Sequence, residues 1–200
     1  MEKPWFKVLV NGRSCHNWDL AWSLPKQEGD TWVPGDWHEV VGTLAICVSG
    51  LHVTQNPAAW WLQGCDVYLC EPEGIETEQE DKAVARRVRL LRPASAAELI
   101  AACIYSDGQH RIASGRAVAS GSATVRAWGS ATVRAWDSAT VRASGSATVE
   151  AWDSATVRAW DSATVTEVYG QPKVDVKDYA VAIDRRNGAP VIRTAKTEGA

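Results

Sequence analysis

Residues 114–165 read SGRAVASG SATVRAWG SATVRAWD SATVRASG SATVEAWD SATVRAWD SATV, an octapeptide that repeats with almost no variation. A short period repeated this closely is typical of a solenoid, in which each repeat buries its apolar side against its neighbours. One octapeptide is too short to bury a core alone, so this stretch decides the fold.

The repeat has the alternation of a β-strand. From Ala123 to Trp128 the small apolar residues alternate with Thr, Arg and Trp, and a period of two is typical of a strand with one buried face. The Gly-Ser or Asp-Ser pair that follows favours a turn. A helix is the alternative, because Ala and Arg are good helix formers, but these pairs would interrupt it in every repeat. We therefore expect a β-solenoid with strands of about six residues, inward Ala and Val, and outward Thr, Arg and Trp.

The number of octapeptides in one coil sets the shape of the solenoid. Two per coil give a flattened solenoid of two sheets with a thin core that Ala and Val can fill. Three per coil is the alternative, because Ser120 and Ser144 replace Trp at an interval of 24 residues. A three-sided coil would enclose more space than Ala and Val fill, and voids are costly. Two strands per coil are favoured.

The outward side chains are the candidate binding residues. In coils of 16 residues, successive strands lie about 4.8 Å apart, so Arg126, Arg142 and Arg158 form one column and Arg134 precedes Glu150 in the other. Neighbouring like charges repel by roughly 1 kcal/mol in water, and we expect Trp and corner Asp residues to offset this. The alternatives are a solvated wall, a binding face and a homodimer contact. The candidate residues are Trp128, Trp136, Trp152, Trp160, Arg126, Arg134, Arg142 and Arg158.

Composition limits the classes of protein. A chain of 200 residues forms one or two small domains, and a net charge of −3 gives no bulk attraction to nucleic acid or membrane. No apolar run approaches the roughly 18 residues that a membrane helix needs. The five Cys residues and the absence of a leader pattern predict a cytoplasmic protein with reduced thiols.

The whole chain predicts a mainly β protein in four parts. These are a small α+β domain (1–92), a linking and capping helix (93–105), the solenoid (106–169) and a C-terminal hairpin with a tail (170–200). In the first part, Asn56-Pro57 predicts a short helix. The acidic run 71–81 predicts an exposed loop, and residues 83–91 predict a strand with a basic face, whose simplest role is to pair with the acidic run.

The helix of the second part follows from a capping box. Ser95 and Glu98 have the spacing of this motif, so we expect a helix over residues 96–104. It is apolar enough to lie across the end of the solenoid, where a bare edge would invite assembly.

Three segments of the first part carry a resemblance. They are Lys7 with Gly12 and Cys15, the run Gly35-Asp36-Trp37-His38-Glu39-Val40, and the run Cys47-Val48-Ser49-Gly50-Leu51-His52 followed by Asn56-Pro57. Residues 5–74 resemble an uncharacterised domain family of phage and prophage proteins, in which short Ser-Ala-rich repeats often follow. This family usually has a further Cys where this chain has Thr54. The resemblance implies a phage-encoded accessory protein and brings no established activity.

Four residues are candidates for a metal site or for catalysis. Cys15, His16, Cys47 and His52 are of the types that bind zinc, and Cys47 with His52 could form a nucleophile pair. The C-x4-H spacing differs from the tight C-x2-C pairs of zinc modules, and Cys and His also pack in small cores. We therefore predict no metal, no cofactor and no catalytic residue.

These patterns favour interaction over catalysis. The prediction is a non-enzymatic, phage-encoded protein that presents its Thr, Arg and Trp face to a protein partner and inhibits a host defence component. The alternatives are a solenoid that binds or mimics nucleic acid, an enzyme that uses Cys47 and His52, and a self-assembling structural protein. No membrane partner is expected.

Overall fold

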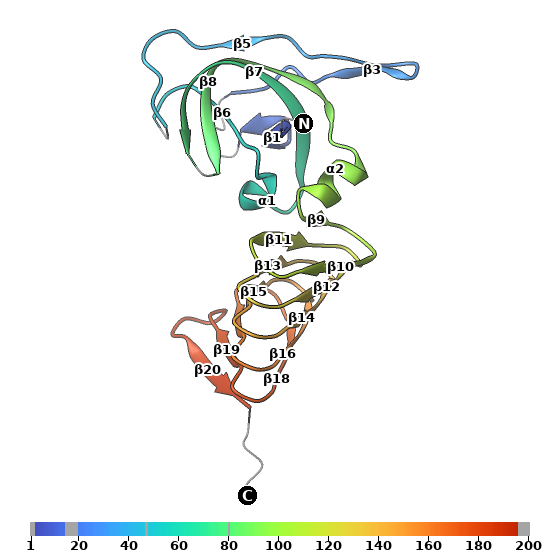
Figure 1. Ribbon diagram of the computed structural model, residues 1–200, viewed down its shortest axis with the longest axis vertical. Helices are drawn as coiled ribbons and strands as arrows, with labels where there is room; N and C mark the ends of the chain where they lie inside the picture. Colours follow the sequence, from blue (N-terminus) through green and yellow to red (C-terminus); the bar gives the residue numbers. More distant parts are fainter. Residues whose placement is uncertain (1–2, 15–19, 47, 80, 196–200) are drawn as a thin grey trace, which may run out of the picture. The chain divides into compact units, whose positions relative to one another are not determined.

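The computed structural model of the chain describes residues 3–14, 20–46, 48–79 and 81–195. It divides into two compact units, Met1–Ala102 and Cys103–Ala200. The protein is mainly β, with 51% strand and 5% helix, and the second unit is the predicted β-solenoid (Figure 1).

The first unit is built on a six-stranded antiparallel sheet that forms a half-barrel. Its strands β7 and β8 curve around β1 (Figure 1). The sheet order is β2 (Arg13–Ser14), β1 (Trp5–Val10), β7 (Cys65–Gln79), β8 (Lys82–Pro93) and β5 (His38–Glu39), with β6 (Leu51–Val53) also paired to β8. A separate hairpin joins β3 (Lys26–Glu28) to β4 (Thr31–Val33). Apolar residues of β1, β6 and β8 form the core of this unit.

The acidic run is a strand, and the prediction of an exposed loop is wrong. Strand β7 continues to Gln79 and pairs with β8 along its length. Its carboxylates lie opposite the guanidinium groups of β8, and the ion pairs are Glu71–Arg89 at 2.6 Å, Glu73–Arg87 at 2.7 Å, and Glu76–Arg86. Opposite charges across an antiparallel pair stabilise it. The predicted pairing of the two segments is therefore confirmed.

Both predicted helices form, and both are short. Helix α1 (Pro57–Trp60) has Pro at its start, and the Asn56 side chain makes no capping hydrogen bond. Helix α2 (Ala96–Ala101) has the complete capping box. The Glu98 N–H donates to Ser95 Oγ at 3.3 Å, and the Ser95 N–H donates to Glu98 Oε2 at 2.8 Å.

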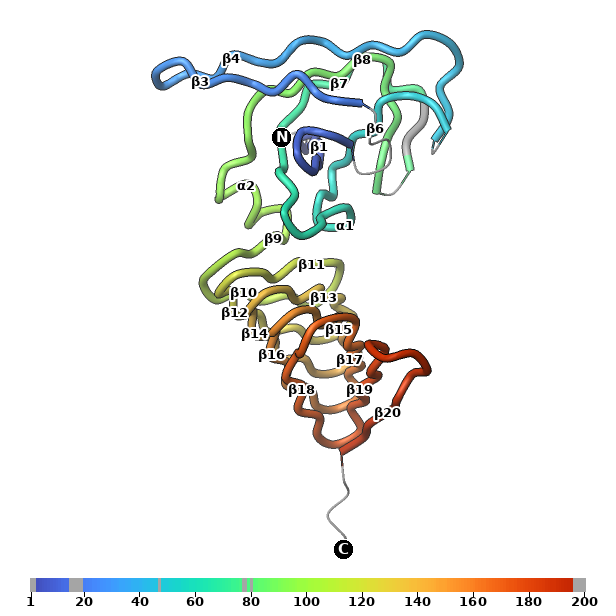
Figure 2. Tube along the Cα trace, turned by 180° about the vertical axis from the view of Figure 1, so that it is seen from behind, coloured from blue at the N-terminus to red at the C-terminus, as the bar shows by residue number. Residues whose placement is uncertain are grey.

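The second unit has two strands per coil, as predicted. One sheet runs in the order β10 (Gln109–Ile112), β12 (Thr124–Ala127), β14 (Thr140–Ala143), β16 (Thr156–Ala159), β18 (Lys173–Val176). The other runs β9 (Ile104–Tyr105), β11 (Arg116–Ala119), β13 (Thr132–Ala135), β15 (Thr148–Ala151), β17 (Thr164–Glu167), β19 (Val181–Asp184), β20 (Val191–Thr194). Figure 2 shows the two sheets along opposite sides of the coils. Thr124 lies beside Thr140, and equivalent positions are 16 residues apart. The 24-residue coil is thereby excluded.

The core of the solenoid is as thin as the repeat predicts. The inward Val125, Val133, Val141 and Val149 have no exposed surface, and Ala fills the positions around them. Two flat layers of small side chains pack without room for a larger residue.

The corners explain why the octapeptide ends in Gly or Asp. The backbone has a positive φ at this position, 59° at Gly129 and 55° at Asp161, which Gly adopts freely and Asp tolerates. A Cβ on Gly129 would meet the Ala113 carbonyl oxygen at 2.5 Å. Where Asp is present, its carboxylate also has a role. Asp161 Oδ2 accepts the Gly145 N–H, one coil earlier, at 3.0 Å.

The coils continue beyond the repeated sequence. Strands β18 and β19 extend the two sheets, with one extra residue in the last coil, since Thr156 lies beside Lys173. Glu167 stands at an inward position where the repeat has Ala, and it is paired with Arg186 at 3.0 Å and with Arg193. Strand β20 pairs with β19 antiparallel, so the predicted hairpin is confirmed.

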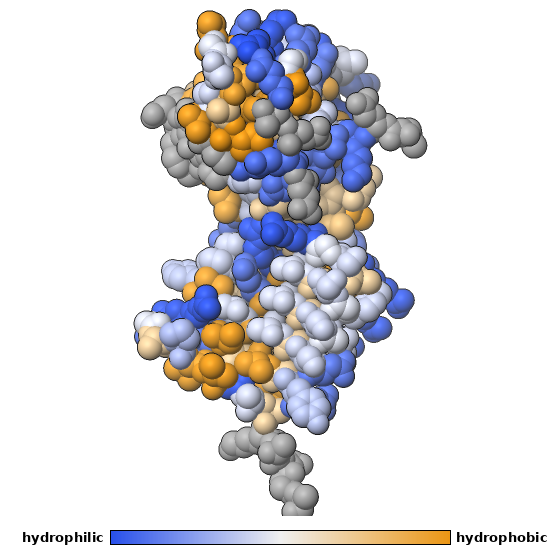
Figure 3. All heavy atoms as spheres, turned by 60° about the vertical axis from the view of Figure 1, so that its left-hand side comes forward, coloured by the Kyte–Doolittle hydropathy of each residue, from blue (hydrophilic) through white to orange (hydrophobic). Residues whose placement is uncertain are grey.

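The terminal hairpin exposes apolar side chains. Val191 and Ile192 of β20 are more than half exposed. In Figure 3, orange hydrophobic atoms gather on part of the visible face of the solenoid unit, beside its pale Thr- and Ser-rich surface.

Candidate functional site

Four arginines form a ladder across the outer face of one solenoid sheet. Arg111, Arg126, Arg142 and Arg158 are register partners in β10, β12, β14 and β16, and all four are exposed. We call these four residues the arginine ladder, and their sheet the arginine sheet. Adjacent strands lie about 4.8 Å apart. The ladder therefore presents one guanidinium per coil at a fixed interval.

Within the described ranges of the chain no ion pair neutralises the ladder, and Asp175 of β18 lies beside Arg158 at the end of its column. No ring contact of the four arginines occurs in these ranges either. The expected compensation by corner Asp residues is not found for this column, because Asp161 instead binds a backbone N–H. Each neighbouring pair of arginines retains a repulsion of roughly 1 kcal/mol in water, and salt reduces it.

Arg134 is not part of this ladder. It lies in β13 on the opposite sheet, where its register partners are Val118 and Glu150. Thr166 follows Glu150 in the same column. This second sheet therefore presents a mixed surface, whereas the arginine sheet carries four like charges in succession before Asp175, the register partner of Arg158, ends the row.

The four tryptophans do not form one face. Each follows the end of a four-residue strand, so the expected six-residue strand is too long. Trp128 and Trp160 follow strands of the arginine sheet, and Trp136 and Trp152 follow strands of the other sheet. Since the chain turns from one sheet to the other after each strand, the two pairs occupy opposite corners.

The two tryptophan pairs differ in their surroundings. Trp136 is 8% exposed, and it stacks on Trp152 with ring centroids 4.3 Å apart and planes inclined by 12°. Trp136 is therefore covered by the ring of the neighbouring coil and presents little surface to a partner. Trp128 is 42% exposed, since the next residue in its column is Ser144 and not Trp.

A hollow opens where Ser144 stands between Trp128 and Trp160. The Ser144 N–H donates to the Ala127 carbonyl at 2.9 Å, and the Trp160 N–H donates to the Ala143 carbonyl at 3.1 Å, so the three corner residues follow one another coil by coil. The hollow has a volume of about 350 Å³, and its lining residues are Arg111, Arg126, Ala127, Trp128, Arg142, Ser144 and Trp160. The arginine ladder thus forms one wall, and tryptophans form its two ends.

A second hollow lies beyond Trp160 in the same column. It measures about 210 Å³ and is lined by Arg142, Arg158, Ala159, Trp160, Asp175 and Lys177. Trp160 therefore separates two hollows that both border the ladder. Cationic and aromatic groups thus border both hollows, and the Asp175 carboxylate adds a negative charge to the wall of the second.

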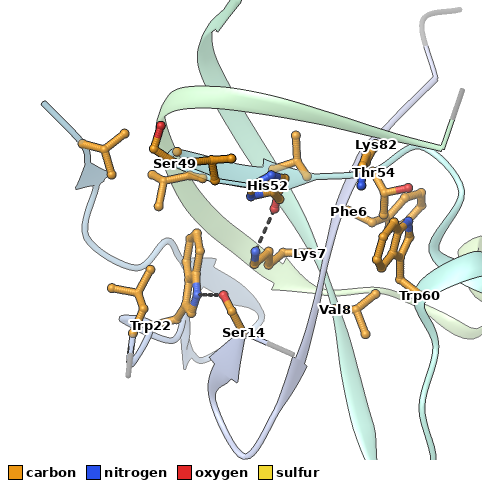
Figure 4. Close-up of a pocket in the computed structure, with 16 residues that line it drawn as sticks. Phe6, Lys7, Val8, Ser14, Trp22, Ser49, His52, Thr54, Trp60 and Lys82 are labelled. Atoms are coloured by element: carbon orange, nitrogen blue, oxygen red, sulfur yellow. Dashed lines mark hydrogen bonds between the residues drawn. The ribbon is translucent and has the colours of Figure 1, made fainter. Parts of the chain in front are cut away.

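The first unit contains a separate cavity of about 550 Å³ inside the half-barrel. Figure 4 shows Lys7 pointing into it, where Nζ donates to the His52 carbonyl oxygen at 2.7 Å. The ammonium also lies 4.8 Å from the centroid of the Trp22 ring, and Trp22 Nε1 donates to Ser14 Oγ at 2.9 Å. Lys7, Gly50 and His52, which come from widely separated segments of the first unit, thus line this cavity.

Of the four residues considered as candidates for a metal site or for catalysis, three lie outside the described ranges. These three are Cys15, His16 and Cys47, whereas the fourth, His52, lines the cavity of the first unit. Within residues 3–14, 20–46, 48–79 and 81–195, no group of three His, Cys, Asp or Glu side chains is arranged to hold a metal.

Two other titratable groups of the first unit have structural environments. Burial raises the pKa of the Cys70 thiol to about 12, against a smaller lowering by Lys7, so this thiol is neutral and a poor nucleophile. Burial also lowers the pKa of His38, whose Nε2 accepts the Ser23 N–H at 2.9 Å. Both observations indicate packing roles for these side chains.

Comparison with protein-family models, with curated proteins and with solved structures finds no match for this chain. In the part of the chain that the structure describes, no helix has the length and apolar character to cross a bilayer. The chain's own geometry therefore carries the functional argument.

Proposed function

We propose that the solenoid is a non-enzymatic binding element, and that its arginine ladder docks a partner with closely spaced negative charges. The observation that carries this proposal is the register of four exposed arginines with no ion pair inside the described chain. A guanidinium donates paired hydrogen bonds to carboxylate and phosphate groups, so each coil offers one anion site.

The scaffold favours such binding because it fixes the backbone positions from which the four arginine side chains project. Backbone hydrogen bonds join the parallel strands, and the Val residues beneath them are fully buried. The backbone beneath the ladder therefore loses little conformational freedom on binding, and the cost of ordering falls on the exposed arginine side chains. A bound polyanion would also remove the repulsion between neighbouring arginines.

The same repulsion opposes a homodimer through this face, since two copies would bring two rows of positive charge together. A partner of opposite charge is therefore the better fit. The phage origin, the protein partner and the inhibition of a host component remain predictions from the sequence.

Binding of fluorescent polyphosphate to the full chain tests this proposal. We expect the affinity to fall steeply as salt rises, because bound anions displace counterions. The ladder variant Arg126→Gln/Arg142→Gln should bind at least roughly tenfold more weakly, as expected for the loss of two charge-assisted contacts. The control Arg116→Gln/Arg134→Gln removes the same charge from the opposite sheet and should bind nearly as well as the wild type. Equal losses in the two variants would contradict a role for the ladder.

A further inference from the structure

We infer that the partner of the arginine ladder is single-stranded nucleic acid, and that one of its bases occupies the hollow between Trp128 and Trp160. This inference rests on the proposed function, because it takes the ladder as the docking surface. It adds the chemical class of the partner, which the ladder alone does not define.

The opposite corner of the solenoid shows what fits in this hollow. There, Trp136 and Trp152 occupy the same position in successive coils and stack at 4.3 Å with nearly parallel rings. In the column of Trp128 and Trp160, Ser144 removes the ring between them. The site lacks one planar aromatic group at a position where this fold otherwise stacks one.

The spacing of the coils matches a single inserted ring. Trp128 and Trp160 are two coils apart, or about 9.6 Å along the solenoid at the usual strand separation. A ring placed midway would lie about 4.8 Å from each tryptophan, within the range of roughly 4.5–7 Å for aromatic pairs. A nucleobase inserted above Ser144 would therefore stack on both of its faces.

The ladder lies where the phosphates of such a strand would run. Arg126 and Arg142 belong to the strands that precede Trp128 and Ser144 and line the same hollow. The second hollow lies past Trp160 with Arg158 and Lys177 in its wall, and Asp175 in the same wall marks the end of the cationic row. Phosphates along the ladder and bases along the corner form the pattern of a single-strand binding surface, in which cationic groups track the backbone and aromatic groups stack on bases.

Two other polyanions fit less well. The bases of a duplex are already paired and stacked, and must be extruded before they can enter a pocket. An acidic protein surface supplies carboxylates for the ladder, but its binding does not require a planar ring in the hollow between the tryptophans. The hollow between two tryptophans is thus the observation that favours exposed bases.

The test compares two fluorescent oligonucleotides of equal length and charge, oligo-thymidine and a wholly abasic strand, in anisotropy titrations with the full chain. We expect oligo-thymidine to bind at least tenfold more tightly and to quench tryptophan fluorescence. The variant Ser144→Trp fills the hollow but keeps the ladder, so it should bind both strands at the abasic level. The control Val168→Trp adds a ring at the opposite corner, next to Trp152 in its column, and should leave both affinities unchanged.

The possible results separate this inference from the proposed function. Equal binding of the two strands, or an unchanged preference in Ser144→Trp, would overturn base insertion while the ladder remains a polyanion site. If polyglutamate of equal charge binds as tightly as oligo-thymidine, an acidic protein surface becomes the better partner and the inference fails. If neither strand nor polyphosphate binds, the proposed function fails with it. A second variant, Trp128→Ala, should also lose the preference for bases. If this variant and Ser144→Trp still bind the abasic strand, both proteins are folded.

Discussion

At the scale of single residues, the corner position of the octapeptide carries two requirements at once. It needs a positive φ, which is 53° at Asp153 and 61° at Gly145. Asp also supplies a carboxylate that binds a backbone N–H one coil earlier, as between Asp153 and Asp137 at 3.4 Å. Gly meets the first requirement, and Asp meets both at some steric cost.

Substitution of Asp161 separates these two requirements. Asp161→Gly loses the bond to the Gly145 N–H but relieves the backbone. Asp161→Ala loses the same bond and keeps a Cβ at φ 55°, where a non-glycine residue without a local hydrogen bond costs about 1 kcal/mol or more. We expect the free energy of unfolding in urea to be lowest for the Ala variant. The value for the Gly variant should be equal to that of the wild type or slightly lower. Equal stability of the two variants would show that the backbone at this corner is not strained.

Glu98 makes the stability of the first unit depend on pH. Its hydrogen bonds to Arg92 hold its pKa at about 2, below the usual 4.5, with further help from Ser95 and against the effect of burial. Because the pKa of Glu98 is lower in the folded state than in the unfolded state, the ionised carboxylate stabilises the fold at pH values above its unfolded-state pKa. This contribution is lost as the pH falls from about 4.5 towards 2.

Thermal unfolding between about pH 5 and pH 2 measures this dependence. The variant Glu98→Gln keeps the side-chain shape but cannot ionise, so its melting temperature should fall less steeply over this interval. Parallel pH profiles for the wild type and the variant would rule out a contribution from this carboxylate.

At the scale of elements, the thin core makes each strand intolerant of larger side chains. Ala143 is fully buried between the two sheets of the solenoid. Ala143→Leu adds three carbons to a packed layer, and overpacking of this kind costs about 1–3 kcal/mol. Thr140→Leu changes the outer face of the same strand and should stay within about 0.5 kcal/mol. Urea unfolding of the two variants checks the difference, and similar losses would argue against the two-layer packing.

The sequence was sufficient to predict the elements whose signals are local. The alternation of inward Ala and Val with outward Thr, Arg and Trp predicted the strands, and Gly-Ser and Asp-Ser pairs predicted the corners, because both signals depend on neighbouring residues. The acidic half of β7 was missed for the opposite reason. Its charges favour an exposed loop until the arginines of β8 are placed across from it, and that pairing is not visible in local composition.

The candidate site was predictable only in part. The 16-residue offset placed Arg126, Arg142 and Arg158 in one column. Arg111 was missed because its coil is one residue shorter, with Gln109 beside Thr124. The exposure of the tryptophans could not be read from the repeat, since it depends on whether the next coil supplies a Trp or a Ser at the same corner.

At the scale of the whole molecule, the order of the coils decides which charges share a face. Deletion of residues 137–152 removes one complete coil and joins Trp136 to Asp153-Ser154, which restores the local sequence. Every later strand then stays on its own sheet, and Arg158 follows Arg126 in the ladder. Deletion of residues 137–144 also leaves an acceptable corner, but it moves every later strand to the other sheet and places Glu150 beside Arg126.

Polyphosphate binding distinguishes the two deletions. We expect the longer deletion to bind several-fold more weakly than the wild type, because one of the four phosphate contacts is lost. The shorter deletion should bind no better than the Arg126→Gln/Arg142→Gln variant, although fewer residues are removed. Circular dichroism of both proteins provides the control for folding. If the shorter deletion bound more tightly than the longer one, the assignment of the arginines to one sheet would be wrong.

The use of two octapeptides in every coil also has a consequence for inheritance. Tandem copies of one short sequence are readily gained and lost when a gene is copied. Addition or loss of a single copy would exchange the two sides of all the coils that follow, whereas a change by two copies only lengthens or shortens the molecule. Selection for an intact charged side would therefore retain even changes and discard odd ones, so descendants of this gene should differ by whole coils.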